Sequence, residues 1–306
     1  MRKRDFLKAS AVGGLAAAPV LANAQAGPTY SWKMATGWAS GPLMDIGAKA
    51  FAERMAAVSG GRFKIQVFPG GALGNALRVP ETVKNGVAEC GHTWMGYDWG
   101  KDVTTVLFGG YAGSMDSERM LHWLYGAGGD EMQRAHREAK EGVISMPLFI
   151  RTAEAFLHSR KPVKSLADLK GLKLRTAGAW LEMAKDLGAA RVHQPTAPFE
   201  LVINKEVWQK MPAADQQLVQ LIARLVTFES WIKVGNEDAK ALEFYRKAGN
   251  QIIELDADVQ KQARKIGLDW AAKTAEKDPA FAKILKSQID FEKEWEGAER
   301  WRTIRG

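Results

Sequence analysis

The sequence predicts an α/β fold with a largely parallel sheet. Between residues 30 and 94, strand-like and helix-like segments alternate in the order β-α-β-α-β, which calls for right-handed crossovers. The 306 residues are 46% hydrophobic and 25% charged, an ordinary globular composition. The chain is long enough for two lobes that each bury a core.

The first 24 residues are expected to be an export signal. They hold the basic start "MRKRDFLK", the short apolar run "AVGGLAAAPVLA" and the small-x-small site Ala22-Asn23-Ala24. The apolar run is too short to span a bilayer stably. The stretch "KRDFLK" also looks like a twin-arginine signal with Lys3-Arg4 in place of the arginine pair, so the export route stays open. We expect cleavage after Ala24 and a periplasmic protein.

The first predicted lobe contains five elements. They were assigned from apolar residues of period two in strands and of helical spacing in helices. They are a strand at 30–36, a helix at 43–61, a strand at 62–71, a short helix at 76–86 and a buried strand at 87–94.

The pattern changes after a glycine-rich middle at 109–129. The expected elements are a strand at 142–150, a strand and turn at 154–163, a capped helical turn at 165–171, a strand at 172–176, a helix at 179–189, a strand at 198–205, a long helix at 212–249, a short strand at 251–255 and two final helices.

The long helix starts with Pro212 in its first turn. Its expected apolar face consists of Leu218, Leu221, Ile222, Leu225 and Val226. The last helix opens with the cap Asp278-Pro279. Five tryptophans at helical spacing are expected to pack in the core rather than bind a ligand: Trp208, Trp231, Trp270, Trp295 and Trp301.

Charge and cysteine content exclude several classes. The formal net charge is +8, and it falls to about +5 without the signal, which carries four basic residues and one acid. This mild excess attracts a small anion. Basic and acidic residues are interleaved, so no nucleic-acid partner is expected. Cys90 is the only cysteine, which rules out an internal disulfide.

Common enzyme signatures are missing from the sequence. "GWASG" has its serine one place late for a nucleophile elbow, and neither a G-x-G-x-x-G nor a P-loop pattern occurs. The five histidines show no zinc-binding spacing, and His92 is interpreted as structural. An exported α/β enzyme stays as an alternative, with Glu154 and Asp98 as its only acid–base candidates. We expect a binding protein and no catalytic residues.

Two arginines stand where predicted strands end. Arg175 closes "GLKLRTAG" just before the turn at Ala177-Gly178, and Arg151 follows "PLFI". Ligands of open α/β sheets bind at strand ends, and a guanidinium holds a carboxylate by two parallel hydrogen bonds. Arg175 is therefore a candidate carboxylate clamp. Arg151 is either a second carboxylate partner or a solvated charge.

Four stretches carry a resemblance to a known family: "FKIQVFPGGALG", "VKNGVAECGHTWMGYDWGKD", "VKSLADLKGLKLRTAG" and "PFELVINKEVWQKMP". They resemble the DctP-type solute-binding proteins of tripartite ATP-independent periplasmic (TRAP) transporters, and most of all the branch that binds 2-oxo acids, lactate and similar carboxylates. The resemblance runs over nearly all of the chain after the signal. It implies a two-lobed, type II-like periplasmic binding protein that closes on an organic acid and delivers it to the transporter's membrane subunits. The resemblance leaves open whether the protein forms a homodimer.

The resemblance also implies site residues. Arg175 matches the carboxylate-clamping arginine, a role that lysine fills less well. Trp38 matches the aromatic residue that walls the pocket, and Glu154 stands where the branch often has a ligand-contacting glutamine. The aromatic "YYYW" stretch is matched by Tyr97, Asp98 and Trp99, with Asp98 in place of a tyrosine.

One family segment is missing. In the family, a strand, a helix and an "IDATEW" motif that helps bind a cation separate "DLGA" from "HQP"; here "DLGAARVHQP" runs straight through, with the join at Arg191-Val192. Gln194 matches a position that completes the cation shell. We therefore expect no metal site, although the branch implies a ligand-bridging cation. The chain is either an impaired binder, a degenerate copy without binding or a sequencing artefact.

The expected domain organisation follows from these assignments. Lobe I comprises residues 27–148, with a contribution from 205–236. Lobe II comprises residues 149–198, truncated near 191–193, with a contribution from 237–306. The long helix is expected to bridge the two lobes.

Overall fold

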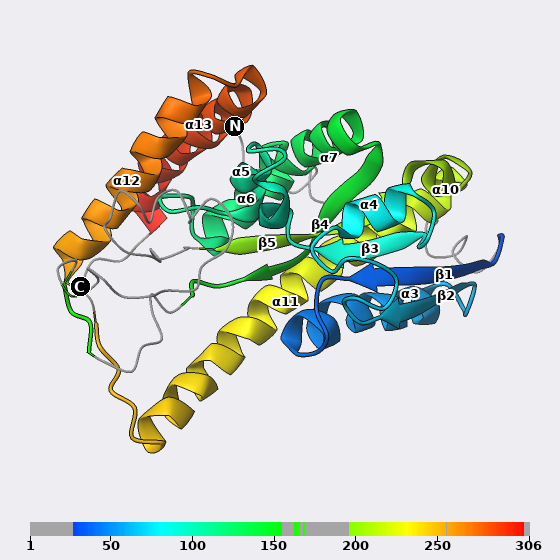
Figure 1. Cartoon of the computed structure of the whole chain (residues 1–306), viewed down its shortest axis with the longest axis horizontal. Coiled ribbons are helices and arrows are strands. Elements are labelled where there is room, and N and C mark those ends of the chain that lie inside the picture. The colour runs from blue at the N-terminus through cyan, green and yellow to red at the C-terminus, as the bar shows by residue number, and fades with distance from the viewer. Residues whose placement is uncertain (1–26, 155–161, 166–167, 169–195, 255, 303–306) are drawn as a thin grey trace, which may run out of the picture. The chain divides into compact units, whose positions relative to one another are not determined.

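The computed structural model describes residues 27–154, 162–165, 168, 196–254 and 256–302 (Figure 1). The chain divides into two compact units. Among the described residues, the first unit draws on the ranges within 27–92, 137–148 and 201–227, and the second on those within 93–154, 162–168, 196–200 and 228–302, without 137–148.

The first unit is built on a parallel β-α-β-α-β arrangement, as predicted. Its elements in chain order are β1 (Tyr30–Thr36), the π-helical segment η1 (Leu43–Lys49), α3 (Ala50–Val58), β2 (Phe63–Phe68), α4 (Val79–Lys84) and β3 (Cys90–Thr93). β1 pairs in parallel with β2, from Tyr30 opposite Phe63 onward, and with β3, from Met34 opposite Cys90.

A single five-stranded sheet has the order β2-β1-β3-β5-β4. Strands β4 (Val143–Arg151) and β5 (Ala197–Asn204) are buried over almost their whole length and run from the first unit into the second. Helix α10 (Lys205–Gln209) follows β5, and its cap is the Asn204 side chain. The predicted α/β class with a largely parallel sheet is confirmed.

Both faces of the sheet in the first unit are buried, because alternate residues of each strand belong to different clusters. On β1, Trp32 and Met34 join the larger cluster, which α3 and the first half of α11 (Ala213–Lys247) complete. Ala35 joins the smaller cluster under α4. Gly91 lets α4 approach, since a Cβ there would lie 2.3 Å from a methyl carbon of Val79.

Helix α11 packs on the first unit with a face that is rotated from the predicted one. Its buried residues are Leu218, Val219, Ile222, Ala223 and Val226. Leu221 and Leu225, which were predicted on the same face, are 49% and 45% exposed. Positions i, i+1, i+4 and i+5 therefore form the buried side of the helix, and the two leucines lie beyond its edge.

A buried ion pair ties the sheet of the first unit to α11. The Arg62 guanidinium donates to both carboxylate oxygens of Asp215, at 2.6 and 3.2 Å, and to the carbonyl oxygen of Pro28 at 2.8 Å. The Tyr30 hydroxyl donates to the same carboxylate at 2.7 Å. Burial and this carboxylate together raise the pKa of Tyr30.

The second unit is mainly helical. Its elements are the 3-10 segment η2 (Met95–Asp98), α5 (Thr105–Gly109), α6 (Ser117–Gly126), most of α7 (Gly129–Glu141), the second half of α11, α12 (Ala257–Ala275) and α13 (Pro279–Arg302). Its core is rich in aromatic and methionine side chains. Gly267 on α12 lies against the Ala112 backbone, where a Cβ would be 1.7 Å from the carbonyl oxygen.

Some predictions about the second unit were wrong. Helices α6 and α7 were not predicted: α6 lies within the glycine-rich middle at 109–129, and α7 begins at its last residue. Residues 251–254 form no strand. Trp301 is 91% exposed, whereas Trp208, Trp231 and Trp270 are buried or pack against a core as expected. The Asp278 cap is confirmed, because its carboxylate accepts from the backbone N–H of Ala280 and Phe281.

Cys90 lies at the start of β3 with no exposed surface. Its Sγ is 3.8 Å from the carbonyl oxygen of Lys33, and burial raises the pKa of the thiol. Within the described part of the chain, no helix combines the length and hydropathy needed to cross a membrane.

Candidate functional site

Trp38 lies in the loop that leaves the carboxyl end of β1, where ligands of open α/β sheets bind. Three hydrogen bonds hold this loop. Gly37 N–H donates to the carbonyl oxygen of His92 at 3.1 Å, and Gly70 N–H to that of Trp38 at 2.7 Å. The Thr36 hydroxyl donates to the carbonyl oxygen of Trp38 at 3.0 Å. The ends of β1, β2 and β3 therefore fix the backbone that carries the indole.

The Trp38 ring is half-buried and packs against a histidine. Its centroid lies 4.8 Å from that of His92, with an interplanar angle of 64°. His92 has no exposed surface. A Cβ at Gly70 would lie 2.9 Å from the Trp38 nitrogen, so only glycine lets the β2 loop come this close. This geometry suits a rigid aromatic wall.

The aromatic turn at Tyr97, Asp98 and Trp99 belongs to the second unit, and all three side chains are half-buried. Trp94, the residue just before η2, packs against the turn. Its indole N–H donates to the carbonyl oxygen of Gly109 at 2.9 Å, and its ring meets Tyr97 edge-on at 5.2 Å.

A buried histidine–aspartate pair follows this turn. The backbone N–H of Asp102 donates to the carbonyl oxygen of Asp98 at 2.8 Å. The Asp102 carboxylate lies 2.6 Å from Nε2 of His136 on α7, and both side chains are less than 10% exposed. The aromatic turn is thereby joined to a helix of the same unit.

Arg151 and Glu154 form an ion pair where β4 ends. Nη1 of Arg151 lies 2.8 Å from a carboxylate oxygen of Glu154, and the two side chains are 18% and 31% exposed. The carbonyl oxygen of Arg151 accepts from the hydroxyl of buried Thr196, just before β5, at 2.9 Å. The Thr152 hydroxyl donates to Asp238 of α11. This strand end is thus held by side chains from two other segments.

The structure places the predicted site residues in both units. Trp38 lies in the first unit; Tyr97, Asp98, Trp99, Arg151 and Glu154 lie in the second. Arg175 and Gln194 lie outside the described residues, so the carboxylate clamp and the cation-shell position stay predictions.

The sequence reasoning missed two contacts. It took His92 as purely structural, although His92 packs against the predicted pocket aromatic. It also treated Arg151 and Glu154 separately, although opposite charges three residues apart directly after a strand indicate a pair.

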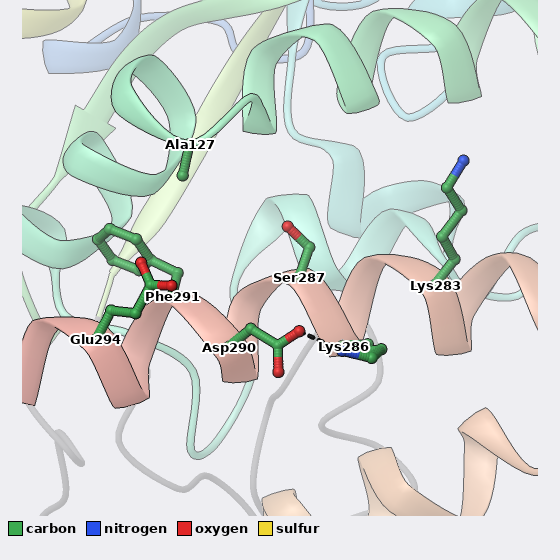
Figure 2. A pocket seen from close by; sticks show the side chains of 7 residues that line it. All are labelled: Ala127, Lys283, Lys286, Ser287, Asp290, Phe291 and Glu294. Atoms are coloured by element: carbon green, nitrogen blue, oxygen red, sulfur yellow. Dashed lines mark hydrogen bonds and ion pairs between the residues drawn. The ribbon is translucent and has the colours of Figure 1, made fainter.

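A pocket of about 370 Å³ opens elsewhere, between Ala127 and one side of α13 (Figure 2). Its side chains carry both signs of charge, and Lys286 is paired with Asp290 across one turn. None of the predicted site residues that the structure describes lines it. The residues that line this pocket are not those at the strand ends, so the pocket is not part of the candidate site.

The described residues include histidines, a cysteine and many carboxylates that could serve as metal ligands. Among them, no three His, Cys, Asp or Glu side chains lie close enough together to hold an ion.

The profile described as "DctP: Bacterial extracellular solute-binding protein, family 7" matches residues 34–197 and 191–278. The chain belongs to this family. It is a family of solute-binding proteins, not of enzymes, and the predicted DctP-type resemblance is confirmed. The family profile matches the chain in two segments, and the two matched ranges overlap at residues 191–197.

One curated relative is the "Monocarboxylate 2-oxoacid-binding periplasmic protein" of Nostoc sp. (strain PCC 7120). It is 26% identical over 355 aligned positions, which cover 96% of this chain and 94% of the relative. The alignment is longer than the 306 residues of this chain, so the relative has residues for which the chain has no counterpart.

Two solved structures show the fold. A TRAP periplasmic solute-binding protein from Pseudoalteromonas atlantica, with bound sodium and pyruvate, has a TM-score of 0.81 at 21% identity, covering 89% of this chain and 97% of its own. A TRAP solute-binding protein from Bordetella bronchiseptica, a dimer with calcium and picolinate in one site, has a TM-score of 0.79 at 21% identity, covering 90% and 95%. The predicted two-lobed binding-protein fold is confirmed.

Proposed function

We propose that this chain is the periplasmic binding protein of a TRAP transporter, which captures a small monocarboxylate and delivers it to the membrane subunits. The observation that carries the proposal is the rigid seat of Trp38 at the carboxyl end of β1, within a chain whose family match spans residues 34–278. The 2-oxo acid relative from Nostoc supports a carboxylate as the ligand.

A thermal-shift screen on the chain from Gln25 onward tests this function. A ligand that binds only the folded state raises Tm with concentration. Pyruvate, 2-oxobutyrate, lactate and acetate make up the test set, and glucose and glycerol are the controls. A carboxylate-specific rise in Tm supports the proposal, whereas no shift by any acid at millimolar concentration contradicts it.

Arg175 is proposed as the main carboxylate partner. It ends a predicted strand, and its guanidinium can meet a carboxylate with two parallel hydrogen bonds. Arg175→Ala is expected to lose about 2–5 kcal/mol of binding free energy by calorimetry, the range for truncating one member of a desolvated charge pair. Arg175→Lys, which keeps the charge but not the fork, should recover only part of it. Near-normal affinity in Arg175→Ala would assign the carboxylate to another residue.

Binding is proposed to need no cation. The chain has no counterpart of the "IDATEW" motif, and Gln194 alone is a weak ligand. Dialysis against EDTA, which removes Ca²⁺, in a buffer free of sodium should leave the carboxylate affinity unchanged. A loss of affinity that Ca²⁺ or Na⁺ restores would show that other residues hold an ion.

The second lobe is proposed to lack a family segment near 191–193. The two-piece profile match and the longer aligned length of the Nostoc relative support this proposal. Water at the opened side would raise the local dielectric constant and weaken the ion pair to the ligand. Inserting the family segment between Arg191 and His193 should therefore tighten binding more than tenfold and introduce cation dependence. The second candidate function is that of a degenerate copy, which should bind no carboxylate until the family segment is inserted.

Export with cleavage after Ala24 is proposed from the signal pattern. The intact mass of protein recovered from the periplasm should correspond to a chain that starts at Gln25. Mature material that retains Met1 would contradict the proposal.

A homodimer is proposed from the second half of α11. Phe228, Ile232 and Leu242 are 39%, 59% and 38% exposed, and with Gly235 and Ala239 they follow an alternating spacing of four and three. This spacing is the heptad pattern that pairs helices. Light scattering should give twice the chain mass for the wild type, and Ile232→Lys should give the monomer. A wild-type monomer at micromolar concentration would remove this part of the proposal.

A further inference from the structure

One asparagine of the sequence is followed directly by glycine: Asn85-Gly86, in the stretch "VKNGVAECG". The pair directly follows α4 in the first unit, and both residues are exposed. The backbone nitrogen that follows an asparagine can attack the side-chain amide of that asparagine. Glycine leaves this nitrogen least crowded because it has no Cβ. Asn85 is therefore the asparagine of this chain with the highest intrinsic reactivity.

The folded backbone holds the reacting atoms of Asn85 and Gly86 apart. Attack closes a five-membered ring, which requires the Gly86 nitrogen to eclipse Cβ of Asn85 along the Cα–C bond. Asn85 has φ −77° and ψ 3°, so the Gly86 nitrogen instead eclipses the backbone nitrogen of Asn85. Gly86 has φ +72°, the left-handed conformation that ends many helices. The ring can therefore close only after this turn has opened.

Backbone hydrogen bonds keep the turn closed. The N–H of Gly86 donates to the carbonyl oxygen of Val83 at 3.0 Å, and the N–H of Val87 donates to that of Thr82 at 3.2 Å. The first bond engages the same N–H that must lose its proton before the attack. Opening the turn breaks both bonds, so only a small fraction of folded molecules is reactive at any time.

The side chain of Asn204, at the end of β5, fastens the end of α4. Its amide nitrogen donates to the carbonyl oxygens of Val83 at 2.9 Å and Lys84 at 3.3 Å. Its amide oxygen accepts from the N–H of Val207 at 3.2 Å, at the start of α10. One side chain thus joins the end of α4 to β5 and α10 of the same unit.

We infer that Asn85 is a site of spontaneous deamidation that the closed end of α4 suppresses, so that the modification marks molecules in which this part of the first unit has opened. The Gly86 nitrogen bonds to Cγ of Asn85, and the side-chain nitrogen leaves as ammonia, taking up through water the proton that Gly86 loses. Water then splits one of the two carbon–nitrogen bonds of the cyclic imide. The product at position 85 is aspartate or isoaspartate.

Both products oppose closure of the turn. Each carries a new carboxylate at the C-terminal end of α4, where the helix dipole is already negative. Isoaspartate also adds a methylene group to the backbone, which shifts the N–H of Gly86 away from the carbonyl oxygen of Val83. An opening that leads to reaction is therefore recorded permanently in the chain.

The test follows deamidation of the chain from Gln25 onward in heavy-oxygen water at mildly alkaline pH, with pepsin digestion in acid and mass spectrometry. In guanidinium chloride, Asn85 should react before Asn75 and Asn250, which precede alanine and glutamine. Without denaturant, Asn85 should react about tenfold or more slowly than in denaturant, because opening of the turn precedes the attack. Equal rates in the two solvents would overturn the inference.

Two variants test whether Asn204 provides the protection. Asn204→Asp keeps an acceptor at the start of α10 but has no donor for the carbonyl oxygens of α4. Its folded form should deamidate at Asn85 about threefold or more faster, with the rate in denaturant unchanged. Asn236→Asp makes the same change at an exposed position of α11 and should leave both rates as in the wild type. An unchanged folded-state rate in Asn204→Asp, or an equal acceleration in Asn236→Asp, contradicts the role given to the end of α4.

Discussion

One ion pair from each unit shows how burial changes the worth of a contact. In the first unit, Arg62 and Asp215 form a pair whose side chains are 6% and 5% exposed. In the second unit, which also buries the Asp102–His136 pair, Arg119 meets Glu299 at 2.7 Å at the border of the helical core, with Glu299 45% exposed. Removing one partner of a buried pair leaves an uncompensated charge, whereas water compensates at the border. Equal contact lengths should therefore give unequal stabilities.

The largest expected effect follows from Asp215→Ala. The substitution leaves the Arg62 guanidinium buried without its carboxylate and also removes the acceptor of the Tyr30 hydroxyl. We expect a loss of about 3–5 kcal/mol in the free energy of unfolding, measured by urea denaturation. Asp290→Ala, which breaks an exposed pair with Lys286, is the control and should change stability little. A loss below about 1 kcal/mol in Asp215→Ala would remove the contrast between the units.

The next effect concerns packing in the second unit. Gly267→Ala would put a Cβ 1.7 Å from the carbonyl oxygen of Ala112, so α12 must shift. We expect a loss of about 1–3 kcal/mol by chemical denaturation. Gly297→Ala in α13, where a Cβ would meet nothing within 4 Å, should instead gain up to about 1 kcal/mol. Equal effects of the two substitutions would show that α12 adjusts freely.

Breaking the border pair should cost less. Arg119→Gln removes the contact to Glu299 and keeps most of the side-chain volume. We expect a loss of about 1 kcal/mol or less, which high salt reduces further. A loss as large as that of Asp215→Ala would show that the partly exposed pair stabilises the fold as strongly as the buried pair.

The smallest effect has the opposite sign. Burial raises the pKa of Glu292, against the lowering by Arg264 and Arg119. A carboxyl whose folded pKa exceeds its unfolded value stabilises the fold below the unfolded pKa and loses that contribution as the pH rises through the folded pKa. Glu292→Gln should therefore raise Tm slightly at neutral pH, and the gain should vanish in acid. A lower Tm at neutral pH would show that the pair with Arg264 prevails.

The strands were readable from the sequence because each has a distinct side-chain pattern. Phe63, Ile65 and Val67 alternate along β2, and β4 and β5 are mainly apolar, apart from Ser145 and Arg151 in β4 and Glu200 and Asn204 in β5. Helices α6 and α7 were not predicted, and α6 lies within the glycine-rich middle at 109–129. The Asp116 side chain, which accepts from the backbone N–H of Arg119, is a cap signal that marks the start of α6.

The sequence indicates where the candidate site lies along the chain, but it does not indicate which side chains touch one another there. That Trp38 follows a strand is visible in the sequence, whereas its packing on His92 depends on β1 and β3 being neighbours. The exposed Leu221 and Leu225 show the same limit. Helical spacing says which residues can share a face, but tertiary packing decides which side of the helix is buried, here that of Val219 and Ala223.

The burial of Cys90 makes the chain suitable for site-specific labelling. Its thiol is inaccessible and its pKa is raised, so a maleimide reagent should leave the native protein unmodified. A cysteine introduced at exposed Ala153 would then be the one reactive thiol. An environment-sensitive dye there, next to Glu154, would report the arrival of a carboxylate by its emission, without removal of the natural cysteine.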